Sequence, residues 1–181
     1  MTYYARNLPH WHPDGRAVFL TWRLSGSLPR AFLERLGRLK TNPGSQFLEA
    51  DRRLDAAQSG PMWLAKPEVA ECVVSTLRRG ERELGQYALH AFVVMASHVH
   101  VLIQPAAPLA RITNGIKGVS AREANRILGR VGQPFWQDES SDRWVRGPAG
   151  MERVVRYIEW NPVKAGLVET PEDWAWSSAR G

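Results

Sequence analysis

Two histidines separated by one residue are the first group in this sequence that can do chemistry. His98 and His100 lie in the segment HVHVLI, whose alternation and β-branched residues predict a strand. Successive side chains of a strand point to opposite faces, so both imidazoles project from one side while Val99, Val101 and Ile103 face the core. Two such imidazoles can bind one divalent metal ion, with a third ligand from elsewhere in the chain. The alternative, which the spacing alone favours, is a pair of solvated histidines on a sheet surface.

A tyrosine and an asparagine four residues apart form the second candidate group. Tyr157 and Asn161 lie in RVVRYIEWNPVKAGL, where helical spacing stacks the two side chains one turn apart on one face. The phenol can attack an electrophile, and the amide oxygen can complete a metal site. Pro162 disfavours helical geometry at Asn161, so we expect this side chain at the helix end. The alternative, favoured by the pattern alone, is a helical core tyrosine and an asparagine at a helix end.

The strand that carries the histidines is expected to be half of a hairpin. Residues 87–95 (YALHAFVVM) predict the other strand, and only Ala96 and Ser97 separate the two. Because apolar residues flank the histidines, we expect the second strand to be central in an antiparallel sheet.

The remaining segments predict helices, one further strand and short irregular pieces. Residues 17–24 predict a strand, residues 45–58 a helical piece or ordered loop, residues 135–146 an irregular or strand-like segment, and WAWSSARG a docking tail. Proline and glycine signals delimit helices. These are expected at residues 29–40, 67–85, 109–129 (with a possible break at Gly115 or Gly118) and 147–160. The order predicts an α+β fold, an antiparallel sheet with helices packed on one face.

Composition limits the class of protein. The chain has 181 residues, of which 44% are hydrophobic, so one globular domain spanning residues 1–181 is expected and a disordered tail is excluded. Cys72 is the only cysteine, which excludes an intramolecular disulfide. The start of the chain lacks the apolar stretch of a signal peptide, and no run is long enough to span a membrane. A cytoplasmic location fits these features, and the net charge of +6 is compatible with a nucleic-acid partner.

Four ordered motifs resemble one family. The HUH segment of single-strand tyrosine transposases, in which two histidines flank a bulky apolar residue, is similar to FVVMASHVHVLI. The C-terminal motif of the REP-associated tyrosine transposases resembles YIEWNPVKAGLV. The start of that family and its linker are similar to RNLPHWHPDG with FLTWRLSGSLP, and to GQPFWQDESSDRWVR. The resemblance covers nearly the whole chain and implies a ferredoxin-like, palm-like HUH fold.

The resemblance also implies a reaction. His98, His100 and Asn161 would bind Mg²⁺ or Mn²⁺, and Tyr157 would cleave single-stranded DNA to give a 5′-phosphotyrosine. The implied substrate is hairpin DNA of repetitive extragenic palindromes, bound by a monomer or homodimer in a nucleoid-associated, cytoplasmic setting. Because a free tyrosine has a pKa of about 10, nearby positive charge is expected to favour its phenolate. The candidates for that charge are Arg153, Arg156 and Lys164.

Basic residues on the helix expected at 109–129 are candidates for DNA contacts. Some of them should track phosphates, whereas the alternative is a solvated helix face. They are Lys117, Arg122, Arg126 and Arg130.

Two departures from the family pattern keep other functions open. Ala96-Ser97 stands where the family has Pro-Asn, and Ser141-Asp142-Arg143 where it has a Tyr-Asp-His run. A hairpin-binding protein that has lost catalysis is therefore the main alternative. A metal-dependent nuclease that uses water is a third, but it leaves Tyr157 without a role.

Overall fold

An antiparallel sheet of four strands forms the centre of the molecule. The computed structural model describes residues 2–5, 9–12, 16–38, 42–56 and 60–181. The strand order is β4 (Tyr87–Val94), β5 (His98–Pro105), β3 (Val18–Arg23) and β6 (Ser141–Trp144). The histidine strand β5 therefore lies inside the sheet, between β4 and β3, as expected. A separate pair, β1 (Thr2–Ala5) with β2 (Pro9–His12), lies near the start of the chain.

The hairpin of β4 and β5 forms as the sequence predicts. The amide of Met95 donates to the carbonyl of His98 across a 2.9 Å hydrogen bond, which closes a turn over Ala96 and Ser97. The register is antiparallel, and it shifts between Leu89 and Ala91. This short connection fixes which residues of β5 face each side of the sheet.

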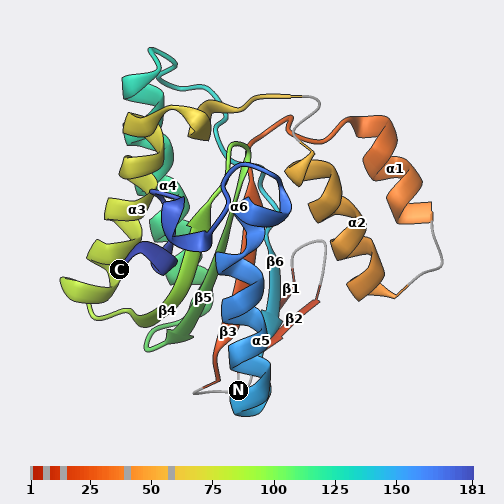
Figure 1. Ribbon diagram of the computed structural model, residues 1–181, viewed down its shortest axis with the longest axis vertical. Coiled ribbons are helices and arrows are strands. Elements are labelled where there is room, and N and C mark those ends of the chain that lie inside the picture. Colours follow the sequence, from red (N-terminus) through yellow and green to blue (C-terminus); the bar gives the residue numbers. More distant parts are fainter. Residues whose placement is uncertain (1, 6–8, 13–15, 39–41, 57–59) are drawn as a thin grey trace.

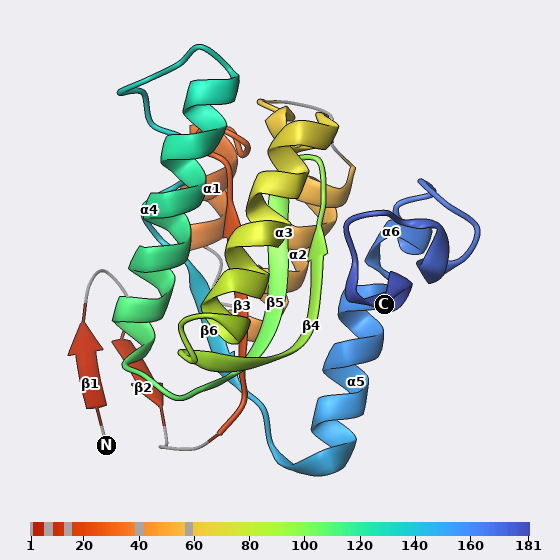
Figure 2. The ribbon, with the colours of Figure 1, turned by 90° about the vertical axis from the view of Figure 1, so that its left-hand side faces the viewer.

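Helices cover both faces of the sheet, whereas we expected them on one. One face carries α3 (Pro67–Arg82) and α4 (Leu109–Ile127), and the other carries α2 (Pro43–Asp55) and α5 (Gly147–Glu159) (Figures 1 and 2). The α+β class is confirmed, but the one-sided arrangement is wrong. The reason is that β5 buries apolar side chains on both of its faces.

Side chains of β5 alternate between the two faces of the sheet. Val99, Val101 and Ile103 pack against α3 and α4 together with Leu77 and Ile112. On the other face Leu102 packs with Ile158 of α5.

Most helix boundaries follow the predicted signals. Helix α2 begins at Pro43, where the Asn42 side chain caps it by accepting from the amide of Ser45 at 2.9 Å. Helix α1 (Arg30–Arg38) lies beside α2, and an Arg35–Glu49 ion pair of 3.4 Å joins them (Figure 1). Helix α4 continues through both of its glycines without a break. Among the described residues, no helix is both long enough and apolar enough to span a membrane.

The end of the chain docks on the sheet, as predicted. The amide of Val94 donates to the carbonyl of Trp176 at 2.9 Å, and the Trp174 indole donates to the carbonyl of Val94 at 3.0 Å. Ser177 forms a bridge with Val93. The tail thereby covers the outer edge of β4, which an exposed edge strand needs. The predicted helix ends at residues 39–40 and 57–58, and residues 6–8 and 13–15 of the first family-like segment, lie outside the described residues.

Candidate metal and nucleophile site

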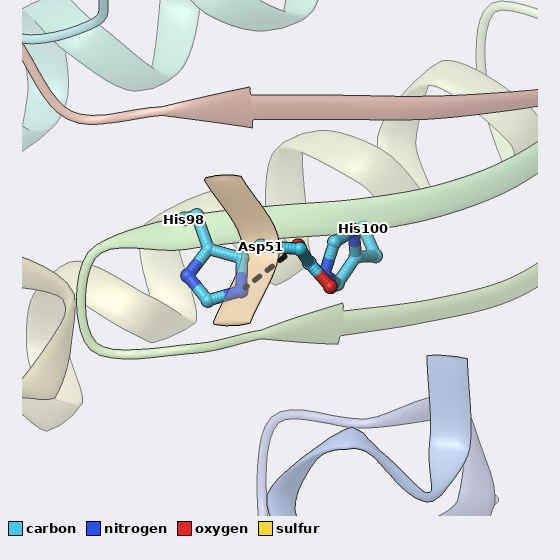
Figure 3. Close-up of side chains that lie close together, drawn as sticks. All are labelled: Asp51, His98 and His100. Carbon is cyan, nitrogen blue, oxygen red and sulfur yellow. Dashed lines mark ion pairs between the residues drawn. The ribbon is translucent and has the colours of Figure 1, made fainter. Parts of the chain in front are cut away.

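The two histidines lie side by side and buried on the face of the sheet that α2 and α5 cover. Their ring centroids are 4.8 Å apart, and the two residues are 1% and 0% exposed. Both imidazoles project from the same side of β5, as the alternation predicted (Figure 3). The alternative of solvated histidines is wrong, because the helices on this face exclude water from both rings.

Neighbouring hydroxyl groups contact the inner nitrogen of each imidazole. Thr21 of β3 lies opposite His100, and its Oγ1 is 2.8 Å from Nδ1 of that ring. Ser97 Oγ is 3.4 Å from Nδ1 of His98. Such partners fix the ring orientation and leave Nε2 for a ligand. Ser97 is one of the departures from the family pattern, and it still supplies a polar contact to the first histidine.

Asp51 of α2 completes a cluster that the sequence did not suggest. Its Oδ1 lies 3.1 Å from Nε2 of His100 and 4.0 Å from Nε2 of His98. Figure 3 shows the carboxylate between the two rings. One ligand atom from each of the three side chains lies within 4.8 Å of the others. Asp55, one helical turn later, places Oδ1 3.3 Å from Nε2 of His98.

The charge state of Asp51 follows from these neighbours. Burial by itself would raise the pKa of this carboxyl. The charge of His100 opposes burial most strongly, followed by His98 and the hydroxyl of Tyr157, and together they lower the pKa to about 2. Asp51 is therefore an anion held between two imidazoles.

Tyr157 reaches the cluster from α5. Its hydroxyl donates a hydrogen bond to Oδ2 of Asp51, and its ring centroid lies 5.7 Å from that of His100. Burial and the Asp51 carboxylate raise the pKa of Tyr157, whereas Arg143 lowers it by a smaller amount. The neutral phenol is therefore the favoured form in this structure.

That protonation state corrects one expectation. We expected Arg153, Arg156 or Lys164 to favour a phenolate at Tyr157. Lys164 does lie over the phenol ring, with Nζ 4.5 Å from the centroid, but Arg156 lies over Trp160. The cation that lowers the pKa of the phenol is Arg143 of β6, which the sequence analysis treated only as a departure from the family pattern.

Asn161 lies at the predicted helix end. Helix α5 ends at Glu159, and the short helix α6 (Asn161–Lys164) begins at this residue. The side chain is 1% exposed, and neither amide atom has a hydrogen-bond partner. It lines a cavity of about 530 Å³ together with Asp51, Asp55 and Tyr157.

The donor set fits a divalent metal ion. Nε2 of each histidine faces a carboxylate oxygen of Asp51 or Asp55 at 3.1 to 4.0 Å, so one ion could replace these contacts. Both amide atoms of Asn161 are buried without a hydrogen-bond partner. Unpaired buried polar atoms are costly, so a native structure generally supplies them with a partner. Two imidazoles with a carboxylate are a known ligand set for divalent metals with open coordination positions.

The sequence carried one unused signal for the acidic residues. Asp51 and Asp55 are four residues apart on the segment predicted as a helical piece, so they share one helical face. Paired acids on exposed helices are common, and nothing in the sequence says that this face is buried against the histidines.

The basic residues of α4 do not join this site. Their helix packs on the opposite face of the sheet. Lys117 donates to the carbonyls of Gln137 and Asp138, at 2.6 and 2.9 Å, and so ties α4 to the segment before β6. The other three lie elsewhere on α4 and after it: Arg126 pairs with Glu123, Arg130 lies over the Trp63 ring at 4.1 Å, and Arg122 is exposed.

Comparison with known proteins supports the fold. A solved structure of a REP-associated tyrosine transposase bound to a REP hairpin matches with a TM-score of 0.56 and 18% sequence identity. The match covers 99% of this chain and 84% of that chain. The resemblance in the sequence motifs is therefore confirmed for the fold. No protein-family model matches the sequence, and no curated protein matches it.

Proposed function

We propose that the protein is a metal-dependent single-strand DNA endonuclease and strand transferase that acts on palindromic hairpin DNA. The observation that carries this proposal is the contact between Tyr157 and the His98–His100–Asp51 cluster. A phenol that only packs in a core has no need of two buried imidazoles and a buried carboxylate beside it. The fold shared with a hairpin-bound tyrosine transposase supports the same choice of substrate.

In this proposal, one group of residues binds the metal ion and another residue attacks the phosphate. His98, His100 and Asp51 would hold Mg²⁺ or Mn²⁺, with the amide oxygen of Asn161 as a further ligand. When bound, the ion would polarise the scissile phosphate and stabilise the charge that develops on it.

Tyr157 is the nucleophile in this proposal. Its hydroxyl oxygen forms a bond to phosphorus while the bond from phosphorus to the 3′-oxygen breaks, which gives a 5′-phosphotyrosine and a free 3′-hydroxyl. The phenol loses its proton as the bond to phosphorus forms, and the departing 3′-oxygen takes up a proton. The hydrogen bond that Asp51 accepts orients the attacking hydroxyl. The phosphotyrosine keeps the energy of the phosphodiester, so strand transfer needs no nucleotide cofactor.

A covalent-adduct assay tests the proposal. Labelled single-stranded hairpin oligonucleotides from DNA flanking the gene are incubated with the protein and Mn²⁺ or Mg²⁺, and the products are run on denaturing gels. We expect a shifted protein–DNA band that Tyr157→Phe eliminates, because the substitution removes only the attacking oxygen.

A second tyrosine provides the matched control. Tyr87 lies on the other face of the sheet, where its hydroxyl donates to the carbonyl of Leu77 at 2.7 Å. Tyr87→Phe should therefore retain the adduct at a small cost in stability, about 1 kcal/mol. An adduct that persists in Tyr157→Phe would show that another residue attacks.

The departures from the family pattern at Ser141 and Arg143 favour a second candidate, a hairpin-binding protein with weak or lost catalysis. In that case the protein binds hairpins, yet no flanking hairpin gives an adduct with either metal. A water-using nuclease would cut DNA without an adduct, so the same gel separates all three functions.

A further inference from the structure

Helix α2 is held on the sheet in a different way from α3 and α5. Helix α5, on the same face as α2, contributes Ile158 and four partly buried side chains to the apolar cluster there. Among the described residues of α2, only Phe47 joins that cluster. On the opposite face, α3 buries a row of large apolar side chains: Val69, Val73, Val74 and Leu77. Apolar contact therefore accounts for little of the attachment of α2.

The polar contacts of α2 match the spacing of the two histidines. Asp51 Oδ1 lies 3.1 Å from Nε2 of His100, and Asp55 Oδ1 lies 3.3 Å from Nε2 of His98. Residues two apart on a strand are about 7 Å apart along it, and residues four apart on a helix are about 6 Å apart along its axis. Each of these two carboxylates of α2 therefore faces one imidazole of β5, as Figure 3 shows for Asp51.

These polar contacts are costly to form without an ion. Asp51 is 3% exposed and both histidines are buried, so the docking of α2 removes polar side chains from water. The desolvation of buried charges offsets much of their mutual attraction. A divalent ion would attract side chains from both sides of this contact, His98 and His100 on β5 and Asp51 on α2. An ion that binds this arrangement better than a sheet without α2 shifts the equilibrium toward docked α2.

We propose that the divalent ion of the histidine site joins α2 to the sheet, so that metal binding and the docking of α2 are one coupled equilibrium. This inference rests on the proposed function, because it takes His98, His100 and Asp51 as metal ligands. Asp51 connects the ion to α2, and the contact between Asp55 and His98 aligns α2 before the ion binds. Release of α2 would take the Asp51 carboxylate away from the Tyr157 hydroxyl, so the ion also controls the orientation of the nucleophile.

Hydrogen exchange measured by mass spectrometry on the full chain tests the coupling. A helix of 13 residues is marginal by itself in water, so undocking exposes the amides of α2 to exchange. Exchange is compared in EDTA and in Mn²⁺ at about one hundred times Kd, which allows a shift of up to about a hundredfold. The Kd comes from a titration that follows the EPR signal of free Mn²⁺. We expect Mn²⁺ to slow the exchange of α2 at least about tenfold more than that of α3, the internal reference.

Two variants that each remove one proposed ligand separate the connection to α2 from metal affinity. Asp51→Ala removes the ligand on α2, and Asn161→Ala removes the ligand on α6. Each is measured at about one hundred times its own Kd for Mn²⁺. We expect Asp51→Ala to lose the slowing of exchange in α2 and Asn161→Ala to keep it. Glu49→Gln is the control for loss of a carboxylate on α2 and should keep the slowing, because its ion pair with Arg35 is exposed.

A third variant keeps the test valid if Asp51→Ala folds poorly. Asp55→Asn leaves the ligands of the ion in place but weakens the contact with His98. It should therefore speed the exchange of α2 in EDTA, and Mn²⁺ should restore most of the protection. Equal exchange of Asp55→Asn and the unsubstituted protein in EDTA would contradict the aligning role of Asp55.

Two outcomes overturn the coupling. Mn²⁺ could bind the unsubstituted protein without slowing α2 more than α3, or it could slow α2 equally in folded Asp51→Ala. Either result would leave the metal site and Tyr157 in place, and the adduct gel would still show its band. Absence of Mn²⁺ binding in the EPR titration would instead contradict the metal-dependent function and the coupling together.

Discussion

Strand β5 is buried on both faces of the sheet, but its side chains on the two faces differ in kind. Towards α3 and α4, strand β5 presents Val99, Val101 and Ile103 to an apolar layer. Towards α2 and α5, it presents His98 and His100, which are equally buried. The first face is covered by an apolar layer, whereas the second holds buried imidazoles and a buried carboxylate, whose removal from water is costly. Both faces contribute apolar packing, and the proposed chemistry belongs to the face that also buries the histidines.

The largest expected effect on cleavage comes from a substitution on the polar face, the side of the sheet that carries His98 and His100. His100→Ala should abolish cleavage and adduct formation, because the substitution removes a ligand from the proposed metal site. Hairpin binding should stay largely intact, since contacts from lysine and arginine to phosphates supply most of such affinity. Adduct gels and binding titrations on one protein preparation measure both.

Removal of the metal gives the matching chemical control. Excess EDTA should reproduce the His100→Ala result in the unsubstituted protein. Full cleavage in EDTA would contradict the metal mechanism and with it the division between the two faces.

On the face of the sheet that α3 and α4 cover, a substitution that creates a cavity should lower stability without changing adduct formation. Leu77 of α3 is fully buried, so Leu77→Ala should lower the free energy of unfolding by about 2–5 kcal/mol. The yield of adduct per folded molecule should not change, because Leu77 packs away from the site. Urea denaturation and an adduct assay at low temperature check the two statements. A loss of adduct in fully folded Leu77→Ala would mean that the faces are coupled.

The smallest of the three effects concerns Asp51, which lies where the polar face meets α2. Asp51→Asn keeps the size of the side chain but removes the negative charge next to both imidazoles. We expect Mn²⁺ to bind at least about tenfold more weakly, a loss of about 1.4 kcal/mol in the stabilisation that a saturating metal gives.

Thermal unfolding with and without Mn²⁺ measures this effect. Glu83→Gln, an exposed change directly after α3, is the matched control and should keep the full Mn²⁺ shift. An unchanged Mn²⁺ shift in Asp51→Asn would leave the two histidines with Asn161 as the metal ligands.

Local sequence rules determined much of the fold and part of the site. A two-residue turn and the alternation of β5 were enough to place His98 and His100 on one side of an interior strand. A spacing of four, followed by Pro162, was enough to place Tyr157 and Asn161 near the end of one helix. These predictions depend only on the periodicity of strands and helices, and that periodicity is a property of the backbone.

The tertiary structure alone decided what surrounds those residues. The approach of α2 brings Asp51 to the histidines, although Asp51 and His98 are 47 positions apart along the chain. The same packing buries both imidazoles, raises the pKa of Tyr157 and brings Arg143 to the phenol. Burial and charge at a site depend on which distant segments pack against it. That packing is set by the sum of many weak contacts across the whole chain, so no local pattern of residues specifies it.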